Sequence, residues 1–393
     1  LNFGKGNFEF AVRGFNELIQ RKPNSQYVPY AYLRRGAAYY NLQQFDKTID
    51  DYATLLDKYP RHPVASEALL PLQEVLSGQS RSDEFEGYLT AYKAANPDKE
   101  GLESIEFETA RNNYYNLAYQ KTIEGFRKYI QTYPTNPKVP EAKYFIAESH
   151  FRLGEFAQAI PVYESLSDMP TFAQYNRVIS RLAELRSEGG SYDQAIERYY
   201  QLASMARNKK EQFNAWSGLM EAYYAKGSYD SVTHYAQTIL EKGNVNISAQ
   251  NKASLYLGKA TYARGDLAAA QDEFLSTLNN ARDQYGAEAQ YLLGELFYRE
   301  GNYEQSIETL INLNKNFGAY ENWVGESYLL LAENYVAMED YFQARGTLNS
   351  LIENFPGEEV KTRAREKLEE IDGLDEDQPG EVIIGSDTSS IDN

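Results

Sequence analysis

The sequence predicts an all-α solenoid of about ten helix–turn–helix units with a period of about 37 residues, and two observations predict it. Apolar residues recur at helical spacing on both sides of short polar turns. A large residue, almost always aromatic, follows each turn at a nearly constant interval. These residues are Phe8, Phe45, Phe85, Tyr119, Phe156, Tyr192, Tyr229, Leu267, Tyr303 and Tyr341. A period in this range with helical spacing inside it is typical of stacked helix pairs.

Composition narrows the classes of protein and partner. The 393 residues include no cysteine, which excludes disulfides and thiolate metal sites, and the net charge of −18 disfavours binding to nucleic acid. No apolar run approaches the ~20 residues that a membrane helix requires. The negative charge therefore favours basic or neutral partners. The glutamates of the candidate groove described below favour basic or amide-rich segments of other proteins.

The unit around Tyr303 illustrates the predicted helix pair. Its first helix is expected to bury Leu293, Leu296 and Phe297, and Gly301 is expected to end that helix in a left-handed conformation. The expected apolar stripe of the second helix consists of Tyr303, Ile307, Leu310 and Ile311. Neither stripe can be buried within one pair, so stacking on the next unit must cover it.

Residues at fixed places in these units resemble the tetratricopeptide repeat family. First helices match at Tyr32, Gly36 and Tyr39, at Trp216, Leu219 and Tyr223, at Leu257 and Gly258, and at Leu293, Gly294 and Phe297. Second helices carry alanine four residues before an aromatic residue at Ala159 and Tyr163, Ala195 and Tyr199, and Ala270 and Phe274. The resemblance implies a right-handed α–α superhelix, although the period here is longer than the family's 34 residues.

The predicted solenoid spans residues 1–372, with a C-terminal capping helix at 358–372. Near residues 77–104 the segment "SGQSRSDEF" replaces the usual turn, so we expect an irregular unit there. The chain starts with half a unit, which suggests a fragment of a longer array. Residues 373–393 are acidic and rich in serine and aspartate, and we expect a disordered tail.

Two connections carry a further pattern, "KYPRHPVASEALL" from Lys58 and "TYPTNPKVPEAKYFIAESH" from Thr132. Prolines in such connections end one helix and prepare the start of the next. The pattern resembles bacterial envelope repeat proteins of the outer-membrane assembly lipoprotein and Tol–Pal-associated types. This resemblance implies a location in the bacterial periplasm or at the envelope, while a cytoplasmic location stays open.

The sequence shows no constellation of catalytic residues. The three histidines, His62, His150 and His234, fall in different units without metal-ligand spacing. No phosphate-binding glycine loop and no nucleophile elbow is present. We therefore predict a protein that is not an enzyme and needs no cofactor or metal.

We call the large residue that follows each turn the turn aromatic. The family resemblance implies that the first-helix positions twelve, eight and five residues before it line a concave groove. Most residues at the five-before position are aromatic, and most at the eight-before position are glutamate. The candidate partner-binding residues are Tyr40, Tyr114, Tyr144, Glu148, Phe151, Glu184, Glu221, Tyr224, Tyr262, Tyr291, Glu295, Tyr298 and Glu333. The other interpretation is that the tyrosines pack between adjacent first helices while the glutamates are solvated.

These observations predict a non-catalytic scaffold that binds a segment of another protein along a groove lined by tyrosine and glutamate. Two alternatives stay open. The chain could bind glycans in an outer-membrane nutrient system, since tyrosine faces stack on sugars. It could also be the repeat region of a larger protein whose activity lies elsewhere.

Overall fold

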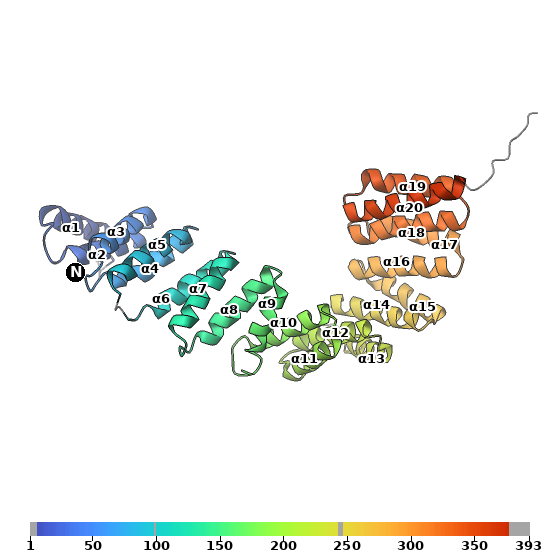
Figure 1. The fold of residues 1–393 in the computed structure, drawn as a ribbon, viewed down its shortest axis with the longest axis horizontal. Coiled ribbons are helices and arrows are strands. Elements are labelled where there is room, and N and C mark those ends of the chain that lie inside the picture. The colour runs from blue at the N-terminus through green and yellow to red at the C-terminus, as the bar shows by residue number, and fades with distance from the viewer. Residues whose placement is uncertain (1–5, 98–99, 243–246, 377–393) are drawn as a thin grey trace, which may run out of the picture. The chain divides into compact units, whose positions relative to one another are not determined.

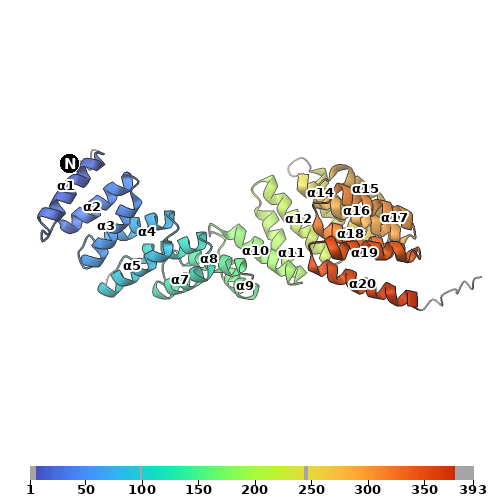
Figure 2. The same ribbon diagram turned by 90° about the horizontal axis from the view of Figure 1, so that it is seen from above.

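The computed structural model describes residues 6–97, 100–242 and 247–376, and these residues fold into twenty α-helices without a strand (Figure 1). The chain divides into two compact units, Leu1–Leu185 and Arg186–Asn393. Within each unit the helices pack on one another in chain order, and Figure 2 shows the same succession from a second direction. The fold is therefore the predicted array of stacked helix pairs.

Even-numbered helices are the first helices of the repeats and odd-numbered helices are the second. The first helices are α2 (Val28–Asn41), α4 (Ser66–Gly78), α6 (Glu103–Tyr115), α8 (Val139–Arg152), α10 (Tyr175–Glu188), α12 (Lys209–Ala225), α14 (Ile247–Ala263), α16 (Gln284–Arg299), α18 (Glu321–Ala337) and α20 (Glu358–Glu376). The second helices are α1 (Phe8–Arg21), α3 (Phe45–Lys58), α5 (Ser82–Ala95), α7 (Tyr119–Thr132), α9 (Phe156–Glu164), α11 (Tyr192–Met205), α13 (Tyr229–Glu241), α15 (Leu267–Asn280), α17 (Tyr303–Asn316) and α19 (Tyr341–Asn354).

Nearly every second helix begins at the large residue that the sequence singled out. The exception is α5, which begins at Ser82, three residues before Phe85. Ser82 lies 37 residues after Phe45 and 37 residues before Tyr119, so the helix start keeps the period while the aromatic residue is displaced. The capping helix was predicted at 358–372 and the tail at 373–393, but α20 continues to Glu376, and the rest of the predicted tail, residues 377–393, lies outside the described residues.

A left-handed residue stands two positions before each of these helix starts. Glycine takes this conformation without a steric penalty, as Gly301 does at φ 76°, which confirms the predicted helix end. Four turns use other residue types, namely Gln43, Ser80, Leu117 and Glu339. The turn geometry therefore recurs even where the sequence carries no glycine signal.

The core of each unit is shared by successive helices. In the first unit, Leu55 of α3, Leu72 of α4 and Phe85 of α5 belong to one cluster and are at most 1% exposed. The stripes predicted around Tyr303 are largely confirmed, because Leu293, Leu296, Phe297 and Leu310 are buried. Ile311 was predicted wrongly: its side chain is 51% exposed, and Leu313 is buried instead. Leu313 lies three residues after Leu310 and shares its face, whereas Ile311 points about 100° away.

Three first helices carry a glycine where they approach the paired second helix closely. A Cβ atom added to Gly258 of α14 would lie 2.7 Å from the ring of Phe274 in α15, and Phe274 is fully buried. Gly36 faces Tyr52 in α3 and Gly294 faces Leu310 in α17 in the same way. None of the helices in the described ranges combines the length and apolar character of a membrane span.

Candidate functional site

The predicted site residues lie on the first helices, and the aromatic residues among them share one contact. In five units the ring lies 5.6–5.9 Å from the ring of the turn aromatic five residues later. The pairs are Tyr40 with Phe45, Tyr114 with Tyr119, Phe151 with Phe156, Tyr224 with Tyr229 and Tyr298 with Tyr303. Each first-helix ring keeps part of its surface exposed. The turn aromatic therefore helps to fix the ring, and two of the rings also contact the next first helix, since Tyr114 lies 5.0 Å from Phe145 and Tyr224 lies 5.3 Å from Tyr256.

Tyr262 differs because its unit has Leu267 at the turn. The guanidinium carbon of Arg299, on the next first helix, lies 4.8 Å from the ring centroid of Tyr262. Burial raises the pKa of Tyr262 above its usual value, and the nearby charge of Glu295 raises it further. A cation–π contact, together with a ring contact to Phe274 at 6.1 Å, thus takes the place of the pair with a turn aromatic.

The two tyrosines at the twelve-before position connect adjacent first-helix regions. The ring of Tyr144 in α8 lies 6.0 Å from that of Phe172, and the ring of Tyr291 in α16 lies 5.3 Å from that of Trp323 in α18. Both tyrosines are half-buried. Burial raises the pKa of Tyr144 to about 12, so its hydroxyl stays protonated and able to donate a hydrogen bond at neutral pH.

The glutamates at the eight-before position have basic partners. Glu221 in α12 pairs with Lys252 in α14, and Glu333 in α18 pairs with Lys367 in α20. Lys259, which occupies the same position in α14, pairs with Glu288 in α16 at 2.6 Å. Ion pairs thus join α12 to α14, α14 to α16 and α18 to α20.

Glu295 makes its pair within one helix. Its carboxylate lies 2.7 Å from the guanidinium of Arg299, one turn later in α16. Of all these glutamates, only Glu148 is nearly inaccessible, at 2% exposure. The face is therefore less acidic than its glutamate content suggests.

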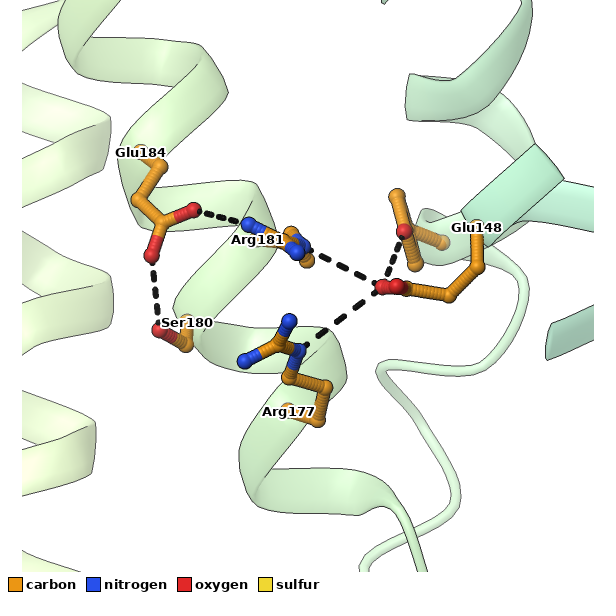
Figure 3. Close-up of polar contacts among 6 residues, drawn as sticks. Glu148, Arg177, Ser180, Arg181 and Glu184 are labelled. Atoms are coloured by element: carbon orange, nitrogen blue, oxygen red, sulfur yellow. Dashed lines mark hydrogen bonds and ion pairs between the residues drawn. The ribbon is translucent and has the colours of Figure 1, made fainter. Parts of the chain in front are cut away.

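Glu148 is the centre of a buried polar network between α8, α9 and α10 (Figure 3). Its Oε1 atom accepts hydrogen bonds from the hydroxyl of Tyr163 at 2.6 Å and from Nε of Arg181 at 3.1 Å. Arg177 approaches the same oxygen to 3.9 Å. Arg181 also donates to Glu184 at 2.7 Å, and its guanidinium carbon lies 3.8 Å from the ring centroid of Phe151.

This network neutralises a carboxylate that would be costly to bury alone. Burial and the negative charge of Glu148 both raise the pKa of Tyr163 far above its usual value. The Tyr163 hydroxyl therefore acts only as a hydrogen-bond donor to Glu148. Glu148, Phe151 and Glu184 are brought together by Arg181 and form one assembly.

At the C-terminal end of the second unit the first-helix face is hollowed. A cavity of about 170 Å³ lies between α16, α18 and α20. Tyr298 and Glu333 line it together with Lys367, over an apolar floor that includes Val336 and Ile371. These two predicted residues therefore meet in one concave place.

Sequence reasoning missed several residues of this face. In the repeat formed by α4 and α5, the sequence alignment placed Phe85 at the start of the second helix. Glu74 was therefore not identified, although it lies eight residues before the observed helix start at Ser82. Glu74 accepts a hydrogen bond from the hydroxyl of Tyr40 at 3.2 Å. The partners Lys252 and Lys367 were also missed. The sequence offered no clear signal for them, because Lys252 lies 31 residues after Glu221 and Lys367 lies 34 residues after Glu333, offsets that differ from each other and from the period.

The fold and this face define a class: a helical-repeat protein with an aromatic and ion-paired surface on its first helices. Family models of the tetratricopeptide repeat match residues 30–62, 255–312 and 326–357. The chain therefore carries tetratricopeptide repeats in both of its units. The comparison with curated proteins gave no match.

Solved repeat structures resemble the chain at low sequence identity. Yeast Tom70 is 14% identical, with 95% of this chain and 94% of that chain covered and a TM-score of 0.41. A tetratricopeptide repeat protein of Parabacteroides merdae is 14% identical, covering 72% and 98%, with a TM-score of 0.36. The C-terminal part of a repeat protein of Cytophaga hutchinsonii is 15% identical, covering 65% and 97%, with a TM-score of 0.46.

Proposed function

We propose that this protein is a scaffold that binds an extended segment of another protein along the face of its first helices. The observation that carries the proposal is the recurrence, within each of the two units, of an aromatic residue at equivalent places on first helices, packed against the turn aromatic and still partly exposed. Such rings offer large contact area at a low entropic cost, because packing has already fixed them.

The ion pairs on this face determine which kind of partner segment it can bind. In the pairs of Glu221, Glu295 and Glu333, the described contact uses Oε1 of the carboxylate. The second oxygen can accept a hydrogen bond from an amide or from a basic side chain. A basic or amide-rich segment therefore suits this face, and its charge is matched without breaking the existing pairs. The bacterial envelope location stays part of this proposal.

Site-specific photo-crosslinking tests the proposal. We expect p-benzoylphenylalanine in place of Tyr224 or Tyr298 to crosslink the same protein from a lysate of the source organism, through one contiguous segment identified by mass spectrometry. The matched control is Phe342, which is 83% exposed on the second helix α19. A probe at position 342 should give no such product. Equal capture at all three positions, or capture of no common segment, would rule out binding along the first helices.

A further inference from the structure

Three tyrosine hydroxyls meet in the second unit, among residues outside the proposed partner-binding set. The hydroxyl of Tyr200 in α11 lies 3.0 Å from that of Tyr223 in α12, and it accepts a hydrogen bond from the hydroxyl of Tyr235 in α13, also at 3.0 Å. The ring of Tyr235 is stacked on that of Tyr223, with centroids 5.9 Å apart, and lies 6.4 Å from that of Tyr200. The cluster therefore joins three successive helices.

The members of this cluster differ in their access to solvent. Tyr200 is 46% exposed, whereas Tyr235 is 9% exposed. A dissolved oxidant therefore reaches Tyr200 directly, and Tyr235 reacts through its neighbours. Burial raises the pKa of Tyr235 above its usual value, and the hydrogen bond with Tyr200 raises it further, so this phenol stays protonated at neutral pH. Loss of an electron from Tyr235 is then accompanied by loss of its hydroxyl proton.

The contact between the hydroxyls also brings reactive ring carbons together. A tyrosyl radical carries its unpaired electron on the oxygen and on the two Cε atoms, which lie two bonds from that oxygen. In Tyr200 and Tyr235 these carbons flank hydroxyls that are already in contact. The chain has 34 tyrosines and no cysteine, so no thiol competes for the oxidant.

We propose that Tyr200 and Tyr235 form a site of oxidative cross-linking that yields a dityrosine bond between α11 and α13. Each phenol gives up one electron and its hydroxyl proton. A bond forms between one Cε atom of each ring, and the hydrogen displaced from each Cε moves to the oxygen, which restores both phenols. The two electrons and two protons reduce one hydrogen peroxide to two waters when a peroxidase supplies the oxidising step.

The bond would connect the second helices of adjacent repeats. Tyr200 and Tyr235 are 35 residues apart in the chain, so the bond closes a loop of that length. A cross-link of this kind stabilises a fold chiefly by restricting the unfolded chain. We expect the oxidised protein to unfold at a higher urea concentration than the untreated protein, with slower hydrogen exchange in α11–α13.

Treatment of the purified chain with a haem peroxidase and hydrogen peroxide tests the proposal. The monomer is isolated, digested with trypsin and analysed by mass spectrometry. We expect peptide 199–207 to be joined to peptide 227–242 with the loss of two hydrogen atoms, and fragmentation to place the bond at Tyr200 and Tyr235. Tyr223 falls in a third peptide, 211–226, so a bond to it would be seen separately.

Two substitutions and a control locate the reaction. Tyr200→Phe and Tyr235→Phe should each abolish the bond, because phenylalanine has no hydroxyl and forms no phenoxyl radical. Tyr115→Phe is the control. Tyr115 is 63% exposed and its ring lies 5.7 Å from that of Tyr114, but its hydroxyl contacts no other tyrosine hydroxyl among the described residues. This substitution should leave the yield of the bond unchanged.

Any of four results would overturn the proposal. The first is the absence of a bond between the two peptides in the monomer, and the second is a bond of Tyr200 to Tyr223 alone. The third is a bond that persists at the same yield in Tyr200→Phe. The fourth is an equal yield from protein unfolded in urea, since the hydroxyl contact exists only in the folded unit.

Discussion

Replacing Glu148 by glutamine is expected to lower the free energy of unfolding of the first unit by about 3 kcal/mol, since one partner of a buried ion pair is lost. Glu148 is 2% exposed, and its Oε1 atom accepts from both Tyr163 and Arg181. Glutamine keeps the shape of the side chain but removes its charge, so the buried guanidinium of Arg181 keeps only Glu184. Urea unfolding, with hydrogen exchange to localise the loss to α8–α10, measures the effect.

Glu184→Gln is the matched control because Glu184 is the other carboxylate that pairs with Arg181. The side chain of Glu184 is 39% exposed, and an exposed pair of this kind contributes less than about 1 kcal/mol. The two substitutions remove the same charge and differ in burial. Equal destabilisation by both would show that burial of Glu148 does not hold these helices together.

Replacing Gly258 by alanine is expected to destabilise the second unit by about 2 kcal/mol, the cost typical of an overpacked core. The added methyl group would lie 2.7 Å from the ring of Phe274, and this fully buried ring cannot shift toward solvent. Alanine normally favours helices over glycine, so the expected loss is opposite to the change in helix propensity. Chemical unfolding of the second unit measures it.

Gly346→Ala supplies the control within the same unit. Gly346 lies inside the exposed part of α19, and an added Cβ would meet no atom within 4 Å. The higher helix propensity of alanine should then make Gly346→Ala stabilise the protein by up to about 1 kcal/mol. A stabilising effect of both substitutions would contradict the close approach of α14 and α15.

Much of the fold follows from periodicity that one sequence displays many times. The turn aromatics mark the starts of nearly all second helices because they sit at fixed places on recurring helix pairs. The repeat of α4 and α5 departs from this rule, because its second helix begins at Ser82, which is not aromatic. Alignment on Phe85 therefore shifts the predicted register by three residues. Ile311 shows a second limit, since adjacent apolar residues leave the buried face ambiguous by one position.

The candidate site was less predictable. The positions of the tyrosines and glutamates on first helices follow from spacing, but their contacts depend on how neighbouring helices stack. Lys252 lies 31 residues after Glu221 and Lys367 lies 34 residues after Glu333, so no constant offset reveals the pairs. The cluster of Tyr200, Tyr223 and Tyr235 depends on how three helices pack together, which a one-dimensional pattern does not record.

Zero-length crosslinking with a carbodiimide tests most directly whether equivalent positions of successive repeats are neighbours. The reagent joins a carboxylate to a lysine only where the two already touch. The stack predicts amide links of Glu221 with Lys252, Glu288 with Lys259, and Glu333 with Lys367, each found by mass spectrometry of the monomer. Absence of these links, with lysines joined instead to carboxylates two or more repeats away, would contradict the account.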